Sequence, residues 1–140
     1  MTFLVERLAG LRRHLDHLRS IRPRVTGRAA LERDQSLQND VLFSLLMVAQ
    51  LVIDIAGELC ARRGERFEDD TEAVRKLARD ERFPPELVSA LEVIPGFRNI
   101  LIHEYVALDL DRVVDALDRL DLIERFLAIV SRLEADEPDR

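Results

Sequence analysis

The sequence predicts an all-α, up-down helical bundle in which one long helix forms the spine. Apolar residues recur at three- and four-residue spacing over most of the chain, which is the period of an amphipathic helix. Hydrophobic residues make up 47% of the 140 residues, and aromatic residues only 5%. The core must therefore consist mainly of aliphatic side chains, which pack well between helices. No run of alternating apolar and polar residues indicates a β-strand.

The first half of the chain predicts two helices. Residues 3–20 carry leucines along one face, and Pro23 and Gly27 then interrupt the helical pattern. A long helix is expected over residues 29–63, with Gly64 in the position of a C-cap glycine. A helix of this length in a small domain is typical of the central helix of a bundle.

The next part of the chain predicts shorter helices separated by turn residues. Thr71 is suited to cap a short helix at its N-terminus. Two prolines at residues 84–85 open the following helix, where proline is tolerated in the first turn. A proline and a glycine at residues 95–96 predict a break or kink before a short helix over residues 97–105.

The C-terminal part predicts one last helix. Asp109 is expected to cap it, and the apolar spacing continues to about residue 134. Residues 135–140 are expected to be frayed. Because a chain of this length fits one core, we expect a single domain over residues 1–140.

Cysteine content and hydropathy predict a cytoplasmic protein. The single cysteine, Cys60, excludes an internal disulfide, which fits a reducing compartment. Residues 2–8 are too few and too charged for the apolar part of a signal peptide. The longest apolar stretch, residues 41–56, contains Asp54 and two other polar residues, so we expect no membrane span.

The net charge of −6 argues against a nucleic-acid-binding surface over the whole protein. The N-terminal part is nevertheless rich in arginine, at Arg7, Arg12, Arg13, Arg19, Arg22, Arg24, Arg28 and Arg33. The last third is acidic, at Asp109, Asp111, Asp115, Asp118, Asp121 and Glu124. Two interpretations stay open: solvated helix faces, or separate charged regions that guide RNA and a protein partner. A helical dimer that binds DNA through the arginines is a further hypothesis.

The segment 96–105 concentrates the polar chemistry of the chain. It brings Arg98, Asn99, His103 and the single tyrosine, Tyr105, into an otherwise aliphatic helix. A histidine can take the proton of a ribose 2′-OH or protonate a leaving oxygen. An arginine stabilises the negative charge that builds on a phosphoryl group. These residue types suit RNA cleavage without a metal ion, and we expect no metal and no cofactor.

Helix geometry complicates this hypothesis. At about 100° per residue, Arg98 and His103 are separated by roughly 140° around one straight helix. A site shared across a two-fold axis would bring both residue types to one phosphate, so we expect a homodimer. The alternative is structural: a histidine that bonds a backbone carbonyl at a helix end, and an arginine in a surface ion pair.

The same residues resemble the HEPN superfamily and, within it, the HepT-like toxins. The resemblance consists of Arg98, four residues, His103, one residue and Tyr105. Residues 30–39, at the start of the long helix, also look like the family. Asp54 follows along that helix, at a place where HepT-like proteins often carry an acidic residue. The expected order of helices fits the HEPN-like bundle over nearly the whole chain.

This resemblance implies a function and a partner. HepT-like proteins are dimers in which the Arg and His motifs meet at the dimer interface, and many are metal-independent endoribonucleases. Carried over, Arg98 and His103 are the catalytic pair, with Asn99 and Asp54 as supporting residues. The family is usually encoded beside a minimal nucleotidyltransferase, MntA, which acts as antitoxin by adding AMP to the motif tyrosine, here Tyr105. The alternative is a non-catalytic HEPN-fold adaptor, a nucleotide-binding subunit of a nucleotidyltransferase complex.

Overall fold

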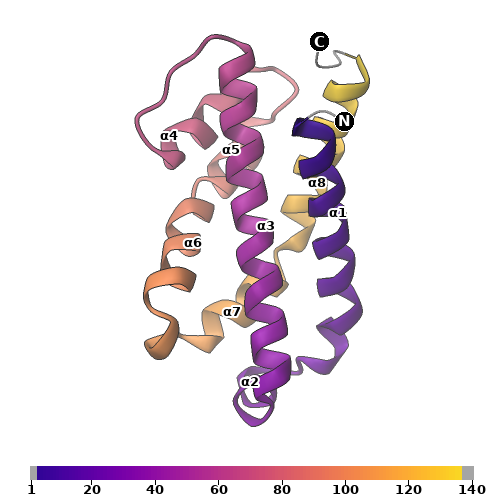
Figure 1. The fold of residues 1–140 in the computed structure, drawn as a ribbon, viewed down its shortest axis with the longest axis vertical. Coiled ribbons are helices and arrows are strands. Elements are labelled where there is room, and N and C mark those ends of the chain that lie inside the picture. Colours follow the sequence, from indigo (N-terminus) through magenta and orange to yellow (C-terminus); the bar gives the residue numbers. More distant parts are fainter. Residues whose placement is uncertain (1–2, 137–140) are drawn as a thin grey trace.

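The computed structural model describes residues 3–136, apart from the side chain of Tyr105. Within this part of the chain every regular element is helical, as the sequence predicts. Three long helices, α1 (Phe3–Ile21), α3 (Gln35–Arg62) and α8 (Leu120–Asp136), follow the long axis of the molecule (Figure 1). The chain runs down α1, up α3, down through α6 and up α8, which is the up-down arrangement expected.

The predicted long helix is divided near its start. Asp34 has extended backbone angles (φ −130°, ψ 98°) and separates α2 (Arg28–Arg33) from α3. Its carboxylate accepts a hydrogen bond of 3.1 Å from the backbone N–H of Leu37 and so caps α3. The prediction of one helix over 29–63 is therefore wrong at Asp34. Gly64, with φ +70°, follows the end of α3 as predicted.

The spine helix α3 is long and strongly apolar. An 18-residue window of its 28 residues has a mean hydropathy of 1.9, so by length and composition it could cross a membrane. The prediction judged residues 41–56 too short and too polar to span a membrane, but the whole helix that contains them is long and apolar enough. In the bundle, 61% of that window is buried, as expected of the core helix of a folded domain. The buried residues on it include Val41, Leu45, Val48, Val52, Ile55 and Leu59.

Two short helices, α4 (Asp70–Arg75) and α5 (Pro85–Leu91), follow α3. The N-cap of α4 is Asp69 and not Thr71, because the Asp69 carboxylate accepts a 2.8 Å hydrogen bond from the N–H of Glu72. Pro85 opens α5 in its first turn, as predicted. Short 3-10 turns complete the connections, at Arg22–Arg24 (η1), Lys76–Arg79 (η2) and Tyr105–Ala107 (η3).

The helix that carries the motif, α6 (Ile94–His103), begins earlier than predicted. Pro95 and Gly96 lie in its first turn and do not break it, because the first N–H groups of a helix have no intrahelical partner to lose. The helix packs against α3 and α4, with Leu101 buried and Ile102 about half exposed. The motif is therefore held on the side of the spine helix.

The predicted C-terminal helix is divided into two. Asp109 caps α7 (Leu110–Leu117), as predicted, by accepting a 3.0 Å hydrogen bond from the N–H of Asp111. A short break then leads to α8, which continues to Asp136. The helix thus ends two residues after the predicted end near residue 134, and residues 137–140 of the tail lie outside the described residues.

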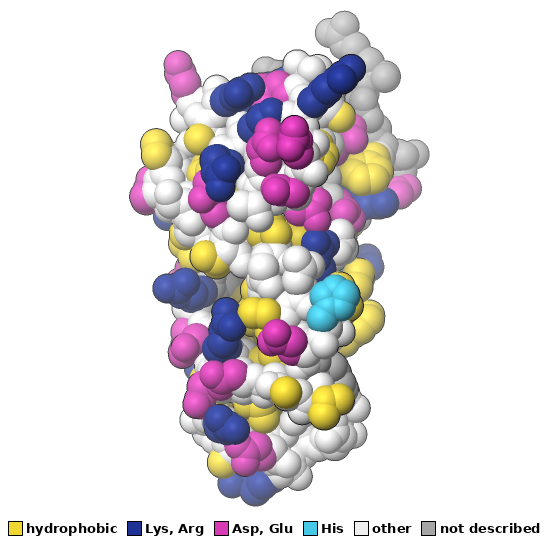
Figure 2. Space-filling view, turned by 90° about the vertical axis from the view of Figure 1, so that its left-hand side faces the viewer, with side chains coloured by type: hydrophobic (Ala, Val, Ile, Leu, Met, Phe, Trp, Pro, Cys, Tyr) yellow, Lys and Arg dark blue, Asp and Glu magenta, His cyan; other side chains and the backbone are white. Residues whose placement is uncertain are grey.

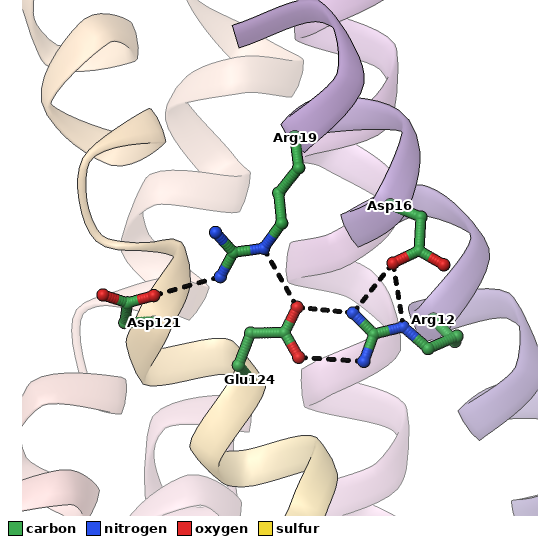
Figure 3. A network of polar contacts seen from close by, with 5 residues as sticks. All are labelled: Arg12, Asp16, Arg19, Asp121 and Glu124. Atoms are coloured by element: carbon green, nitrogen blue, oxygen red, sulfur yellow. Dashed lines mark hydrogen bonds and ion pairs between the residues drawn. The ribbon is translucent and has the colours of Figure 1, made fainter.

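A network of ion pairs joins α1 to α8 (Figure 3). Glu124 of α8 receives hydrogen bonds from Arg12 (Nη1 to Oε2, 2.8 Å) and from Arg19 (Nε to Oε1, 3.1 Å) of α1. Arg19 also bonds Asp121 (3.0 Å), and Arg12 bonds Asp16 (3.1 Å). The arginine-rich and acidic regions of the sequence therefore face each other here and neutralise one another. This contact supports the interpretation of solvated, paired helix faces.

Candidate active site

Among the described polar side chains of the motif, Arg98 is the most enclosed, with only 14% of its side chain exposed. Its Nε donates to Asn99 Oδ1 (2.8 Å), its Nη1 to Gln50 Oε1 (2.8 Å) and its Nη2 to Asp70 Oδ2 (2.7 Å). The acceptors come from α6, α3 and α4, so three helices fix the plane of one guanidinium. An arginine held at all three nitrogens has little freedom left to reorient.

A second layer of contacts connects Asp54 to the same arginine. Gln50 Nε2 donates a 2.8 Å hydrogen bond to Asp54 Oδ1, one helical turn along α3. Because the amide nitrogen of Gln50 is used in this way, its oxygen is directed toward Arg98. We call Arg98, Asn99, Gln50, Asp54 and Asp70 the Arg98 network.

The sequence identified only part of this network. It named Asn99 and Asp54 as supporting residues, and the structure joins both to Arg98, one directly and one through Gln50. Gln50 and Asp70 were not identified. Gln50 carried a weak signal, as a polar residue four positions before Asp54 on an apolar helix, whereas Asp70 carried none.

His103 lies on another side of the same helix. It is the last residue of α6 and its side chain is exposed, whereas Arg98 is turned toward α3 and α4. Among the described contacts of Arg98, none involves His103. Because α6 is continuous from Ile94 to His103, a separation of roughly 140° around the helix axis is expected for the two residues. The described contacts do not bring the two side chains together.

Exposed apolar side chains lie around the end of α6. Ile102 is 49% exposed and Val106 is fully exposed. Of the three consecutive aliphatic residues in the motif, Ile100, Leu101 and Ile102, only Leu101 is fully buried. Tyr105 begins the η3 turn between these residues, and its side chain lies outside the described part of the chain.

The face that carries α4 and α6 is electrostatically mixed. Figure 2 shows lysine and arginine side chains interspersed with aspartate and glutamate over this face, without a continuous basic patch. Attraction of a polyanion to this face must therefore depend on a few particular groups. Within residues 3–136, no cluster of three or more His, Cys, Asp or Glu side chains is arranged to hold a metal ion.

A groove lies elsewhere on the described part of the molecule. It has a volume of about 690 Å³ and is lined by side chains of α3, α5, α6, α7 and α8. The lining is largely apolar and includes Val48, Phe97 and Leu120. Among the described residues, neither Arg98 nor His103 lines this groove. The candidate site is therefore separate from this groove.

The chain matches the model of a known protein family. Residues 11–130 match the family described as Ribonuclease HepT-like. The chain belongs to this family. The match covers the bundle from the middle of α1 to the last turns of α8, and so includes the whole of the Arg98 network and His103.

Two relatives carry names that describe nucleases. A protein of Archaeoglobus fulgidus named "Putative RNase" is 32% identical over 88 residues, which is 63% of this chain and 67% of the relative. The "mRNA nuclease HepT" of Shewanella oneidensis is 27% identical over 101 residues, which is 71% of this chain and 76% of the relative.

The fold is similar to that of solved HepT-like structures. A tri-AMPylated HEPN toxin of Shewanella oneidensis, in complex with an MNT antitoxin, superposes with a TM-score of 0.80 at 22% identity. The match covers 94% of this chain and 99% of that toxin. A toxin–antitoxin structure with AMP-PNP gives the same TM-score at 21% identity, covering 92% of this chain and 97% of that one. The predicted HEPN-like fold is confirmed.

Proposed function

We propose that this HepT-like protein is a metal-independent endoribonuclease toxin in which Arg98 and His103 perform the chemistry. The observation that carries the proposal is the enclosure of Arg98 by acceptors from three helices, in a chain of the HepT-like family. The named relatives of this chain include an mRNA nuclease and an antitoxin-bound toxin. Its substrate would be RNA of the cytoplasm, where a toxin meets its target.

The reaction follows from the two side chains. His103 takes the proton of a ribose 2′-OH, and the 2′ oxygen forms a bond to the neighbouring phosphorus. The bond from phosphorus to the 5′ oxygen breaks, and that oxygen receives a proton from His103 in its protonated form. Arg98 stabilises the charge on the non-bridging oxygens as the phosphorus becomes five-coordinate. No metal ion is needed at any step.

A second copy of the chain would complete the site. Within one chain Arg98 and His103 face different directions, whereas two copies can place one of each beside the same phosphate. Apolar side chains available for such an interface include Ile102, Val106 and Phe43, which is 57% exposed on α3. Light scattering at micromolar concentration is expected to give the mass of a dimer, and a monomer would contradict this part of the proposal.

The partner would be a nucleotidyltransferase antitoxin that modifies Tyr105. The tyrosine oxygen attacks the α-phosphorus of ATP, a phosphodiester bond to AMP forms, and pyrophosphate leaves. The added negative charge and bulk, two residues after His103, would repel RNA. Mass spectrometry after co-expression with the transferase is expected to find AMP on wild-type protein and not on Tyr105→Phe. An unmodified Tyr105 in a neutralised complex would mean inhibition by binding alone.

The deciding experiment is RNA cleavage by the purified, unmodified protein in the presence of EDTA. Wild type is expected to cleave, and Arg98→Ala and His103→Ala are expected to lose cleavage by roughly 10²-fold or more. Cleavage by none of the three would favour the adaptor hypothesis. Equal cleavage by all three would indicate a contaminating nuclease and reject the assignment of these residues.

A further inference from the structure

The acceptors around Arg98 differ in charge and exposure. Asn99 and Gln50 are neutral, whereas Asp70 is a carboxylate 2.7 Å from Nη2. The Asp70 side chain is 40% exposed, against 14% for Arg98. With Asp54 behind Gln50, the Arg98 network carries two carboxylates and one guanidinium. A group that must attract a phosphodiester is thus surrounded by a formal excess of negative charge.

This arrangement conflicts with anion binding by Arg98. A guanidinium has five N–H donors and binds phosphate best through two parallel hydrogen bonds. Asp70 uses one N–H on Nη2, and its negative charge lies where it would repel an incoming phosphoryl oxygen. Either the Asp70 carboxylate moves away from Arg98 when RNA binds, or it stays beside Arg98 and weakens the binding of RNA.

Asp70 is placed so that it can leave. It is the first residue of α4, but the neighbouring Asp69 caps that helix, so α4 does not depend on the Asp70 carboxylate for its first hydrogen bonds. Its exposure gives the released carboxylate immediate access to water. Gln50 and Asn99 carry no charge, and Asp54 fixes the amide of Gln50, so these contacts can persist while phosphate binds.

We propose that Asp70 is a displaceable counterion of Arg98, which the scissile phosphate replaces while Gln50 and Asn99 keep the guanidinium in position. The inference rests on the proposed ribonuclease function and adds a residue that sets RNA affinity. Asp70 holds the arginine in the RNA-free protein at the cost of competing with substrate. Gln50 is a positioning residue, with Asp54 behind it.

The test is the affinity for a 2′-O-methylated RNA, which binds but has no nucleophile. Asp70→Asn keeps an oxygen that can accept from Nη2 but removes the charge. It is expected to lower Kd at least about threefold, because a like charge beside the phosphate has gone. On cleavable RNA, KM is expected to fall with kcat unchanged. The matched control is Glu92→Gln. It removes the charge of the carboxylate that pairs with Arg75 (3.1 Å), and Arg75 lies on α4, as Asp70 does. The Kd of this variant is expected to stay at the wild-type value.

A double-mutant cycle with Arg98→Ala separates competition from general electrostatics. If Asp70 competes for Arg98, then Asp70→Asn gains no affinity once Arg98 is alanine. An unchanged Kd for Asp70→Asn, a lower kcat, or an equal gain in the Arg98→Ala background would overturn the inference while the nuclease assignment stands. If Arg98→Ala alone binds the RNA as tightly as wild type, then Arg98 does not contact phosphate. In that case the proposed role of Arg98 fails, and the inference fails with it.

Discussion

Two arginine networks join helices of this bundle, and they differ in which partner is shielded from solvent. Between α1 and α8, Glu124 is 27% exposed and is shared by Arg12 and Arg19, which are each 44% exposed. Beside α6 the order is reversed, because Arg98 is 14% exposed and its carboxylate partner Asp70 is 40% exposed. A shielded carboxylate between two arginines fastens two helices. A shielded arginine with an exposed carboxylate is held in place while its counterion can be exchanged.

Replacing Arg98 and Arg12, one at a time, with lysine should show most clearly how the two networks differ. Arg98→Lys retains the charge but cannot donate to three acceptors in one plane, so RNA cleavage is expected to fall by roughly 10²-fold. Arg12→Lys is expected to leave cleavage unchanged. Initial rates on one RNA, with thermal melting of each variant, provide the measurement.

Two results would contradict this comparison of the networks. Full activity in Arg98→Lys would mean that charge alone is needed and that the geometry of the Arg98 network is incidental. A loss of activity in Arg12→Lys with an unchanged Tm would mean that the α1–α8 network contributes to the site as well as to the fold.

The helices themselves were largely predictable, because apolar spacing and capping residues are local signals. Asp109 caps the start of α7 and Gly64 follows the end of α3, both as predicted. The break at Asp34 was missed, since an aspartate within a helical pattern is compatible with either an exposed helical position or a cap. Pro95 was given too much weight, because its effect depends on whether it falls in the first turn or in the interior.

Apart from Asp54, which the family resemblance supplied, the candidate site was predictable only where its residues are close in sequence. Arg98 and Asn99 are adjacent, and the motif contains both. Gln50 and Asp70 lie 48 and 28 positions from Arg98, and only the packing of α3 and α4 against α6 brings them to it. Long-range polar contacts of this kind leave no periodic trace in the sequence.

The α1–α8 network is expected to affect stability and not activity. Glu124→Gln keeps the size of the side chain but removes the charge that two arginines share, so the free energy of unfolding should fall by about 1 kcal/mol. That change corresponds to a decrease in Tm of about 3 °C. Asp16→Asn is the matched control with a smaller expected decrease, because this side chain is 64% exposed and, among residues 3–136, its described contact is with Arg12. An unchanged Tm in Glu124→Gln would mean that desolvation cancels the attraction.

The stabilisation by Glu124 should also depend on pH. The hydrogen bond from Arg12, followed by that from Arg19, lowers the pKa of Glu124 below its ordinary value of 4.5. A carboxylate whose pKa is lowered by folding contributes its full stabilisation above the unfolded value, and this is lost as the pH falls through the lowered folded value. The difference in unfolding free energy between wild type and Glu124→Gln should therefore be constant from pH 7 to about pH 5. It should then shrink as the pH falls further, because protonated Glu124 resembles glutamine. Urea unfolding of both proteins across this range measures the difference, and a gap that persists at low pH would assign the effect of Glu124 to packing instead of charge.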